Sequence, residues 1–366
     1  MSRYAPVAAA ALVVLGGPST KPVEVTRIPT ARFESGPVLA GNALLWTEKA
    51  KDGSLSVRVA AGGRVRTIFR AAKPAPPPDL PASPAFDISV GQDARAVAGS
   101  TMVAVLRSVY LVYTPKCRPA CGAPTLVRPY FGELWLGSTH GAFHRVVGRR
   151  PAFGAGCTTV RPTSVDVDGD AVLDTELTET CDTMEPALVS SRVVLRRTRT
   201  GAHTLVTARR WLYEVALAGR FAGWSDSEGA VVVYDLRRRR VSYRVKAALG
   251  FDLQADGTMA LAGEQGVAWV SPAEPWPHRL RADAYGANVR IVGGRIAFAS
   301  QADEGRMWRT SAALVDLHNR VTTLAAYRGS YPSVATVTYV DFDGRSVAFA
   351  LERYPRGGVS LYRIAL

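Results

Sequence analysis

Seven short turns recur along the chain, and each is followed by an apolar segment of strand length. Successive turns lie mostly about 37 or 50 residues apart, and the longest interval contains the insertion with Cys117 and Cys121. Periods of this size are typical of propeller blades. The turns begin at Gly41, Asp93, Gly169, Gly219, Gly257, Gly294 and Gly344. The repeat predicts seven similar units in one domain, although 366 residues would otherwise suggest about two domains.

Each unit continues with two further strand-like segments separated by a tight turn. In the first unit these segments are 55–60 and 65–69, and in the sixth they are 312–317 and 321–324. Four short antiparallel strands form one propeller blade, which cannot cover both of its apolar faces alone. We therefore predict an all-β, seven-bladed β-propeller of four-stranded antiparallel blades.

The two ends of the chain indicate how the ring closes. The last unit supplies three strands, at 337–342, 346–351 and 359–364, and then lacks its fourth. The segment 23–28 alternates in polarity as a strand does and precedes the first unit. We expect this N-terminal strand to pair with the last blade and complete it.

The repeat resembles a known family. Residues 343–349 form an Asp-Gly turn followed by an apolar strand, and Leu361-Tyr362 follows in the next strand. Segments 232–236 and 313–317 repeat the pattern of that third strand. The chain is similar in these motifs to the TolB-like and WD40-like β-propeller repeat proteins of the secreted bacterial type. The resemblance implies a propeller fold and leaves the partner open.

The N-terminus has the pattern of an export signal. Arg3 precedes an apolar stretch at 7–15 and a small-residue segment at 16–20, which is the layout of a signal peptide. The apolar stretch is too short to span a bilayer. We predict a signal peptide at 1–20, a single propeller domain at 21–366 and a secreted or extracytoplasmic location.

The four cysteines fit an oxidising compartment. We favour the disulfides Cys117–Cys121 and Cys157–Cys181, because each closes a local loop. A four-thiolate zinc site is the alternative, but the usual C-x2-C spacing is absent. A proline-rich segment at 71–85 interrupts the repeat, and we interpret it as an extended connector, with a ligand for a partner as the alternative.

The net charge of +14 has two interpretations. It could attract nucleic acid, anionic lipid or acidic polysaccharide, or it could be a solvated surface rich in arginine. The densest basic run, 237–240, falls at an expected turn and is too short for a nucleic-acid patch. We expect no nucleic-acid partner. No P-loop or dinucleotide motif is present, so we expect no cofactor.

The most conspicuous acidic motif is Asp166, Asp168 and Asp170 around Gly169. It suggests a calcium loop, but the glycine and the final glutamate do not fit the EF-hand register. Acidic residues before glycine recur at other turns of the repeat, where they cap backbone N–H groups. We therefore interpret the motif as a turn and keep the three aspartates as metal candidates.

An enzyme hypothesis uses the same kind of residue. Carboxylates at the ends of channel-lining strands could act as an acid and base pair, and the candidates are Asp166, Asp168, Asp341 and Asp343. The repeat alone also explains their positions, and no serine-nucleophile motif is present. An envelope hydrolase or lyase is thus the alternative to a binding protein.

The leading hypothesis is a secreted, non-enzymatic binding or scaffold module for a protein or a cell-envelope polysaccharide. Loops from every blade meet on one face of a propeller, where function usually lies. Trp276, between two prolines, is the candidate for an exposed binding aromatic. Trp46 and Trp224 occupy the same repeat position, so we expect them to pack between blades. We expect a monomer without a transmembrane span.

Overall fold

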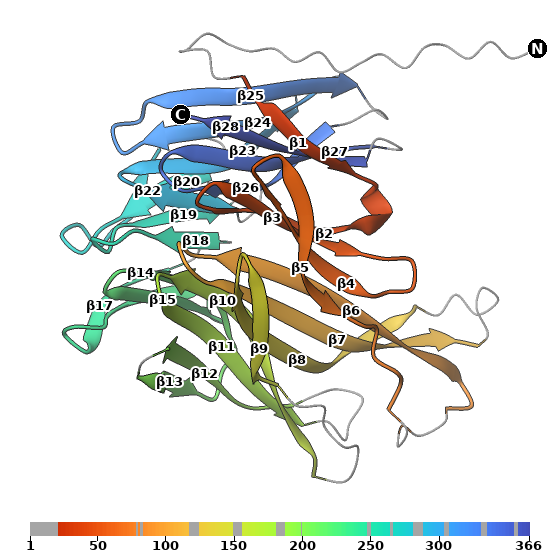
Figure 1. The fold of residues 1–366 in the computed structure, drawn as a ribbon. Helices are drawn as coiled ribbons and strands as arrows, with labels where there is room; N and C mark the ends of the chain where they lie inside the picture. Colours follow the sequence, from red (N-terminus) through yellow and green to blue (C-terminus); the bar gives the residue numbers. More distant parts are fainter. Residues whose placement is uncertain are drawn as a thin grey trace, which may run out of the picture.

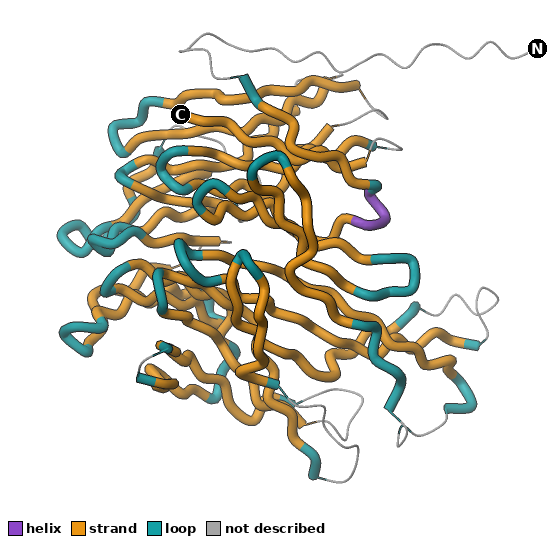
Figure 2. The backbone as a smooth tube through the Cα atoms, in the orientation of Figure 1, coloured by secondary structure: helices purple, strands orange, loops and turns teal. Residues whose placement is uncertain are grey.

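The computed structural model describes residues 21–77, 80, 83–116, 124–148, 156–180, 187–198, 200–246, 250–263, 266–280, 288–303, 307–330, 335–354 and 358–366. Within them the chain is built almost entirely of strands, with one short 3-10 helix, η1 (Thr30–Arg32) (Figure 2). The strands form seven four-stranded antiparallel sheets. Both the fold class and the number of blades predicted from the repeat are confirmed.

The first three blades follow the chain in order. They comprise β2 (Phe33–Ala40), β3 (Ala43–Lys49), β4 (Leu55–Ala61) and β5 (Arg64–Ala71), then β6 (Phe86–Ala98), β7 (Val103–Pro115), β8 (Leu126–Ser138) and β9 (Gly141–Val147), then β10 (Thr158–Asp168), β11 (Ala171–Thr180), β12 (Leu188–Arg197) and β13 (Gly201–Ala208). Blade 2 has the longest strands, 13 residues in each of its first three, and in Figure 1 they reach furthest to the right.

The remaining four blades complete the ring (Figure 1). They comprise β14 (Leu212–Ala218), β15 (Phe221–Asp226), β16 (Ala230–Asp235) and β17 (Arg240–Lys246), then β18 (Gly250–Leu253), β19 (Met259–Gly263), β20 (Gly266–Val270) and β21 (His278–Arg279), then β22 (Val289–Val292), β23 (Arg295–Asp303), β24 (Met307–Asp316) and β25 (Val321–Ser330), and last β26 (Ala335–Phe342), β27 (Ser346–Arg353) and β28 (Gly358–Ala365) with β1 (Val23–Ile28).

The N-terminal strand closes the ring as predicted. β1 pairs antiparallel with β28, from Val23 opposite Arg363 to Ile28 opposite Val359. The side chain of Ile28 is buried between the last blade and the first. The first strand of each blade also contacts the first strands of both neighbouring blades, around the whole ring.

The hydrophobic core is divided between the blades. Seven clusters of buried side chains each join one blade to the next, and an eighth supports the long strands of blade 2. Trp46 and Trp224, predicted to pack between blades, are buried in two of these clusters. This arrangement follows from the repeat, because each blade has two apolar faces and only its neighbours can cover them.

One predicted turn is wrong. Asp93 does not begin a turn; it lies within β6, which continues to Ala98, and the chain turns at residues 99–102. The buried alternation of Val90, Ala94 and Ala96 shows why, since β6 keeps its strand periodicity through Asp93. The side chain of Asp93 consequently faces the centre of the ring rather than a turn.

Candidate functional site

The two faces of the disc differ, and we name each after its connections. The first strand of a blade runs to a short turn, such as Gly41-Asn42 or Gly169-Asp170, and these turns lie on one face, here called the turn face. The opposite ends of the strands, such as the end of β7 and the beginning of β8, lie on the other face, here called the loop face. The first strands surround a central channel between the two faces.

Three aspartates in the channel connect consecutive blades. The carboxylates of Asp166, Asp252 and Asp341 occupy the same place in the first strands of blades 3, 5 and 7. Each accepts a hydrogen bond from a backbone N–H of the next blade, at Leu217 (2.7 Å), Ile291 (2.8 Å) and Leu39 (2.6 Å), respectively. These carboxylates are therefore part of the structure that holds the ring together.

Arg290 joins two of these aspartates across the channel. Its guanidinium lies 3.2 Å from the Asp252 carboxylate and 3.0 Å from that of Asp341. Burial raises the pKa of Asp252, and the charge of Arg290 opposes this shift. Burial also raises the pKa of Asp166 to about 6, again against the attraction of Arg290. One cation thus compensates several buried carboxylates.

These residues separate two cavities. Asp166, Arg290 and Asp341 line both, and they lie at the boundary between them. The turn-face cavity, about 1090 Å³, is lined by the turns themselves. The loop-face cavity, about 380 Å³, is lined by the middle of the first strands. The smaller one falls in the volume range of small-molecule sites.

The loop-face cavity contains carboxylates from three blades. Glu34 of β2, Asp93 of β6 and Glu214 of β14 line it, and each is half-buried. Burial raises the pKa of all three, and nearby cations do not cancel the shift. The charge of Asp93 raises the pKa of Glu34 further, although Lys49, 4.0 Å from Glu34, opposes it. Negative charge in this cavity is incompletely compensated.

A cation in the same cavity also lacks a partner. No hydrogen bond or ion pair joins the Arg95 guanidinium to any other described residue. The channel wall surrounds Arg95, and this desolvation, together with the charge of Arg290, lowers its pKa. Water still reaches its side chain through the cavity. Arg95 is thus a charged group inside the channel whose hydrogen-bond donors are not used by any other described residue.

Tyr339 completes the wall of this cavity. It lies at an irregularity in the pairing of β26 with β27 and has a φ of 48°, a left-handed conformation that is strained for a tyrosine. Its ring packs edge-on against Phe33, at 5.8 Å between centroids, and remains 36% exposed. Such strain is concentrated at functional sites, where the surrounding structure maintains it.

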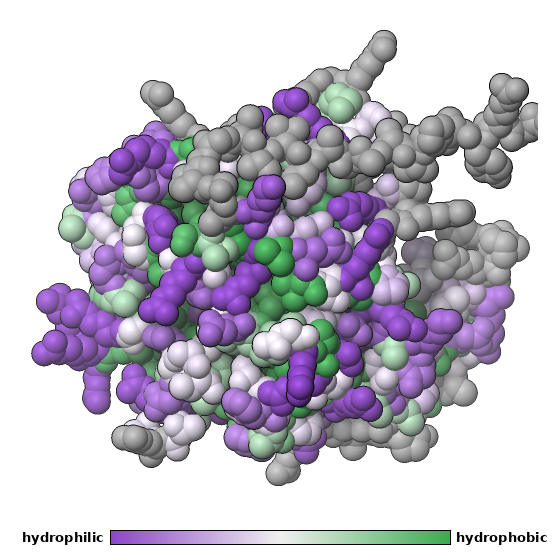
Figure 3. Space-filling model, turned by 45° about the horizontal axis from the view of Figure 1, so that its top comes forward, coloured by the Kyte–Doolittle hydropathy of each residue, from purple (hydrophilic) through white to green (hydrophobic). Residues whose placement is uncertain are grey.

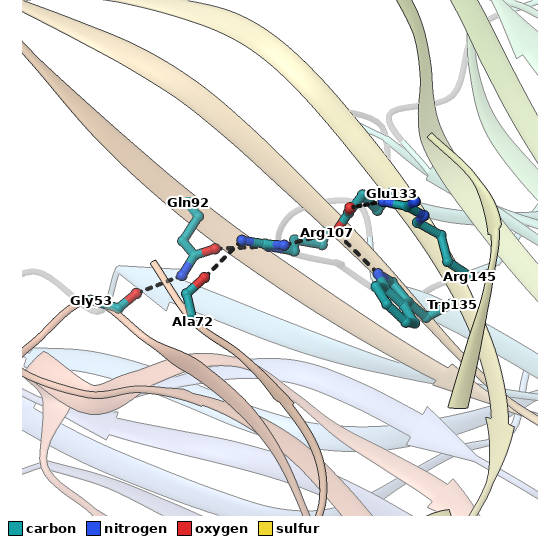
Figure 4. Close-up of polar contacts among 7 residues, drawn as sticks. All are labelled: Gly53, Ala72, Gln92, Arg107, Glu133, Trp135 and Arg145. Carbon is teal, nitrogen blue, oxygen red and sulfur yellow. Dashed lines mark hydrogen bonds and ion pairs between the residues drawn. The ribbon is translucent and has the colours of Figure 1, made fainter. Parts of the chain in front are cut away.

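Arg107 shows how this protein satisfies an arginine that has a structural role. Figure 4 shows its guanidinium donating to Gln92 (2.8 Å), Glu133 (2.7 Å) and the carbonyl of Ala72 (2.9 Å). The network anchors the start of the proline-rich segment to blade 2. Arg107 and Arg290 are therefore both partnered on several sides, in contrast to Arg95.

The predicted acidic candidates have structural partners. Asp168 accepts a hydrogen bond from the Gly219 backbone of the next blade (2.5 Å), and Asp170 accepts one from the Thr198 hydroxyl (3.4 Å). Asp343 caps its own turn at Arg345 (2.8 Å), as predicted for such turns. Asp168 differs from that prediction, because its acceptor function joins two blades.

A calcium site at these aspartates finds no support in the geometry. Within the part of the chain that the structure describes, no three carboxylate, cysteine or histidine side chains converge as metal ligands. Asp166 and Asp168 direct oxygens at backbone N–H groups instead. Asp166 and Asp341 do line the channel, as the enzyme hypothesis requires, but both are engaged in joining blades.

The other predicted site residues lie away from the channel or outside the described residues. Trp276 is 55% exposed and its ring lies 5.9 Å from that of His278, in the connection before the outer strand of blade 5. Cys117, Cys121 and Cys181 lie outside the described residues, so both disulfide pairings stay predictions. The same holds for the signal peptide at 1–20.

Glu34, Arg95 and Glu214 were missed by the sequence interpretation. They lie within first strands, where no turn or motif draws attention to them. One signal was available: Arg95 interrupts a small, apolar stretch between Ala94 and Ala96, both of which are buried. A charged residue in such a strand faces either solvent or a channel.

Comparison with known proteins does not assign this chain to a family. No family model matches the chain, and no curated protein matches it. Among the similar solved structures, the WD40 domain of Neurospora crassa Pan2 has 10% identity and a TM-score of 0.49, over 92% of this chain and 89% of that one. U3-55K has 12% identity and a TM-score of 0.47, over 97% and 98%.

The computationally designed protein Ika8 is similar to the same degree. It has 10% identity and a TM-score of 0.46, over 93% of this chain and 99% of the designed one. Values this low carry no conclusion about activity or partner. The seven-bladed fold of this chain rests on its own strand pairing.

Proposed function

We propose that the protein is an extracytoplasmic binding module that takes a protein or a cell-envelope glycan on its loop face. The observation that carries the proposal is the loop-face cavity, whose charged side chains are poorly compensated, in contrast to those of the turn face. A folded protein gains nothing from desolvating charges that it leaves unpaired. Such groups are explained when a ligand supplies the missing partners.

Exposed apolar side chains also distinguish the strand ends of the loop face from those of the turn face. On the loop face these are Leu126, Val127, Val189, Tyr213, Met307 and Tyr354. On the turn face the exposed apolar residues of the described chain are all aliphatic, namely Val23, Val65, Val241, Val321 and Leu366. Aromatic residues are enriched in binding surfaces, and only the loop face offers them here among the described strand ends.

The predicted disulfides would strengthen the same face. β10 begins one residue after Cys157 and β11 ends one residue before Cys181, and Thr158 pairs with Thr180. Cys117 and Cys121 lie in sequence between β7 and β8. Both disulfides would therefore brace the loop-face extensions of blades 2 and 3. Export through the predicted signal peptide supplies the oxidising compartment that they need.

The membrane and surface observations are compatible with this proposal. No helix in the described part of the chain is long and apolar enough to cross a membrane. On the side of the molecule in Figure 3, hydrophilic and hydrophobic residues are interspersed. The net charge of +14 favours anionic partners, and anionic glycans are among them.

The proposal is tested with the full chain, in pull-downs from envelope extracts and on a glycan array. The double variant Tyr213→Ala and Tyr354→Ala alters the loop face, whereas Trp276→Ala removes a comparably exposed aromatic from the edge of blade 5. We expect the double variant to lose the captured partner and Trp276→Ala to retain it. The opposite result would place binding at Trp276 and contradict a loop-face site.

The second candidate is an envelope hydrolase or lyase, favoured by the raised pKa values of Glu34 and Asp93 in one cavity. A carboxyl with a raised pKa can donate a proton at neutral pH while an ionised neighbour acts as base. Reducing-end release from envelope polysaccharides would identify such activity. Loss of that release in both Glu34→Gln and Asp93→Asn would support an enzyme over a binding module.

A further inference from the structure

The loop-face cavity contains two incompletely compensated charges of opposite sign. One is the positive Arg95, which has no hydrogen bond or ion pair to any other described residue. The other is the negative pair of Glu34 and Asp93, on the neighbouring blades 1 and 2. Arg107 and Arg290 show that this chain readily pairs its structural arginines, so the isolation of Arg95 calls for a different explanation.

Arg95 indicates an anionic group on the ligand. A guanidinium presents five N–H donors in a planar fork that matches a carboxylate or a phosphate. Among the carboxylates, Glu214 has the largest electrostatic effect on Arg95, yet no hydrogen bond joins the two. The donors of Arg95 are therefore available within the cavity.

Glu34 and Asp93 indicate an organic cation. Burial raises the pKa of both carboxyls, and the charge of Asp93 raises that of Glu34 further. Lys49, 4.0 Å from Glu34, opposes both shifts, and a hydrogen bond from Ser108 and the charge of Arg161 also oppose that of Asp93, but neither shift is cancelled. A metal ion is a poor candidate, because no three potential ligands converge in the described residues. An ammonium group needs no fixed coordination shell and can donate to both carboxylates.

The volume restricts the ligand to a small molecule or to the end of a larger one. A cavity of 380 Å³ corresponds to about a dozen water molecules at roughly 30 Å³ each. This is enough for one amino-sugar acid or a short peptide end. The exposed ring of Tyr339 offers an apolar surface against which a sugar ring could lie.

We propose that the loop-face cavity binds a zwitterionic amino-sugar acid, with its carboxylate on Arg95 and its ammonium between Glu34 and Asp93. This inference rests on the proposed function, since it names the chemistry of the ligand that the loop face takes. A ligand of this class neutralises both charged groups of the cavity at once. A ligand with a single charge leaves one of them desolvated and unpaired.

The inference is tested by isothermal titration calorimetry of the full chain with three sugars. Muramic acid carries both charges, glucosamine only the ammonium, and glucuronic acid only the carboxylate. We expect muramic acid to bind at least tenfold more tightly than either of the others. The reason is that removing one charge-assisted hydrogen bond weakens binding by about tenfold or more.

Two variants test the two ends of the ligand separately. Arg95→Gln should weaken the binding of muramic acid about tenfold or more and leave that of glucosamine unchanged or tighter. Asp93→Asn should weaken the binding of muramic acid and leave that of glucuronic acid unchanged or tighter. Asp343→Asn, at a turn-face residue that caps its own turn, is the matched control and should change none of the three affinities.

Several results would overturn the inference. Tighter binding of muramic acid to Arg95→Gln would indicate a site for cations alone, and tighter binding to Asp93→Asn a site for anions alone. Absence of muramic acid binding to a folded wild-type chain would also reject it. If the Tyr213 and Tyr354 variant still loses its captured partner in that case, the proposed loop-face function survives and only the ligand class is wrong.

Discussion

The charged side chains at the two ends of the central channel differ in how many hydrogen-bond and ion-pair partners they have. At the turn face, Asp168, Asp256 and Asp343 each accept a hydrogen bond from a backbone N–H at 2.5–2.8 Å. At the loop face, Glu34, Asp93 and Glu214 have raised pKa values and few partners, and Arg95 has none among the described residues.

The difference separates two kinds of carboxylate. Those that stabilise the fold are here called structural acids, and those that are available to a ligand are called binding acids. Asp166, Asp252 and Asp341 recur at one position of the repeat and perform one structural task, which is to bond the next blade. Glu34 and Glu214 lie outside that recurring set. A charged residue that follows the repeat is explained by the repeat, whereas one that departs from it requires a local reason.

The largest effect is expected for Arg290→Met, which removes the cation at the boundary of the two cavities. Asp252 and Asp341 would lose their ion pairs and remain desolvated. We expect the free energy of unfolding at pH 7 to fall by roughly 3 kcal/mol, measured by urea denaturation. Adding Asp341→Asn should restore part of the loss. A change below about 0.5 kcal/mol for Arg290→Met would mean that the boundary is not held by charge.

An intermediate effect is expected at Asp166. Asp166→Ala leaves the Leu217 N–H without its acceptor and should cost about 1–2 kcal/mol, whereas the amide oxygen of Asp166→Asn can still accept that bond. The two variants therefore separate the hydrogen bond from the charge. Equal losses in both would show that the carboxylate charge, and not the acceptor, is required.

Asp166→Asn should also change the pH dependence of stability. The folded protein raises the pKa of Asp166 from 3.8 to about 6, so the folded state binds this proton more tightly than the unfolded state. The wild type therefore loses stability relative to Asp166→Asn as the pH rises from about 4 to 6, and the difference is constant above that range. Urea denaturation at pH 4, 5, 6 and 7 measures it, with Asp343→Asn as control.

The smallest effect on stability is expected for Glu34→Gln and Glu214→Gln. Burial raises the pKa of both carboxyls, so removing their charge should leave the free energy of unfolding within about 0.5 kcal/mol or increase it slightly. Binding of muramic acid should fall at the same time in Glu34→Gln. A loss of stability comparable to that of Asp166→Ala would place these glutamates among the structural acids and remove the contrast between the two ends.

The fold was predictable because its signals are local and repeated. Gly41, Gly169, Gly219 and Gly344 have positive φ at turns, where glycine is favoured, and the apolar segment after each turn became a second strand. The spare strand at 23–28 was recognisable because the last unit lacks one. Blade 2 was misread at Asp93, since a long strand with small residues resembles two short ones.

The candidate site was less predictable for a physical reason. The capping role of a turn residue such as Asp343 can be recognised from its immediate neighbours in sequence. Glu34, Arg95 and Glu214 come from three blades and acquire a common environment only when the ring closes. Nothing close to Arg95 in the sequence indicates that it will line one cavity with Glu34 and Glu214.

The pairing of β1 with β28 also sets the order of events during synthesis. Glu24 and Tyr362, 338 positions apart, lie opposite each other in one sheet. Among the described strands β1 is synthesised first and β28 last, and blade 7 cannot form until both are present. Until then the nascent protein is an open row of blades with two unpaired edges, a state exposed to aggregation. Completion of this fold is therefore a late event in synthesis.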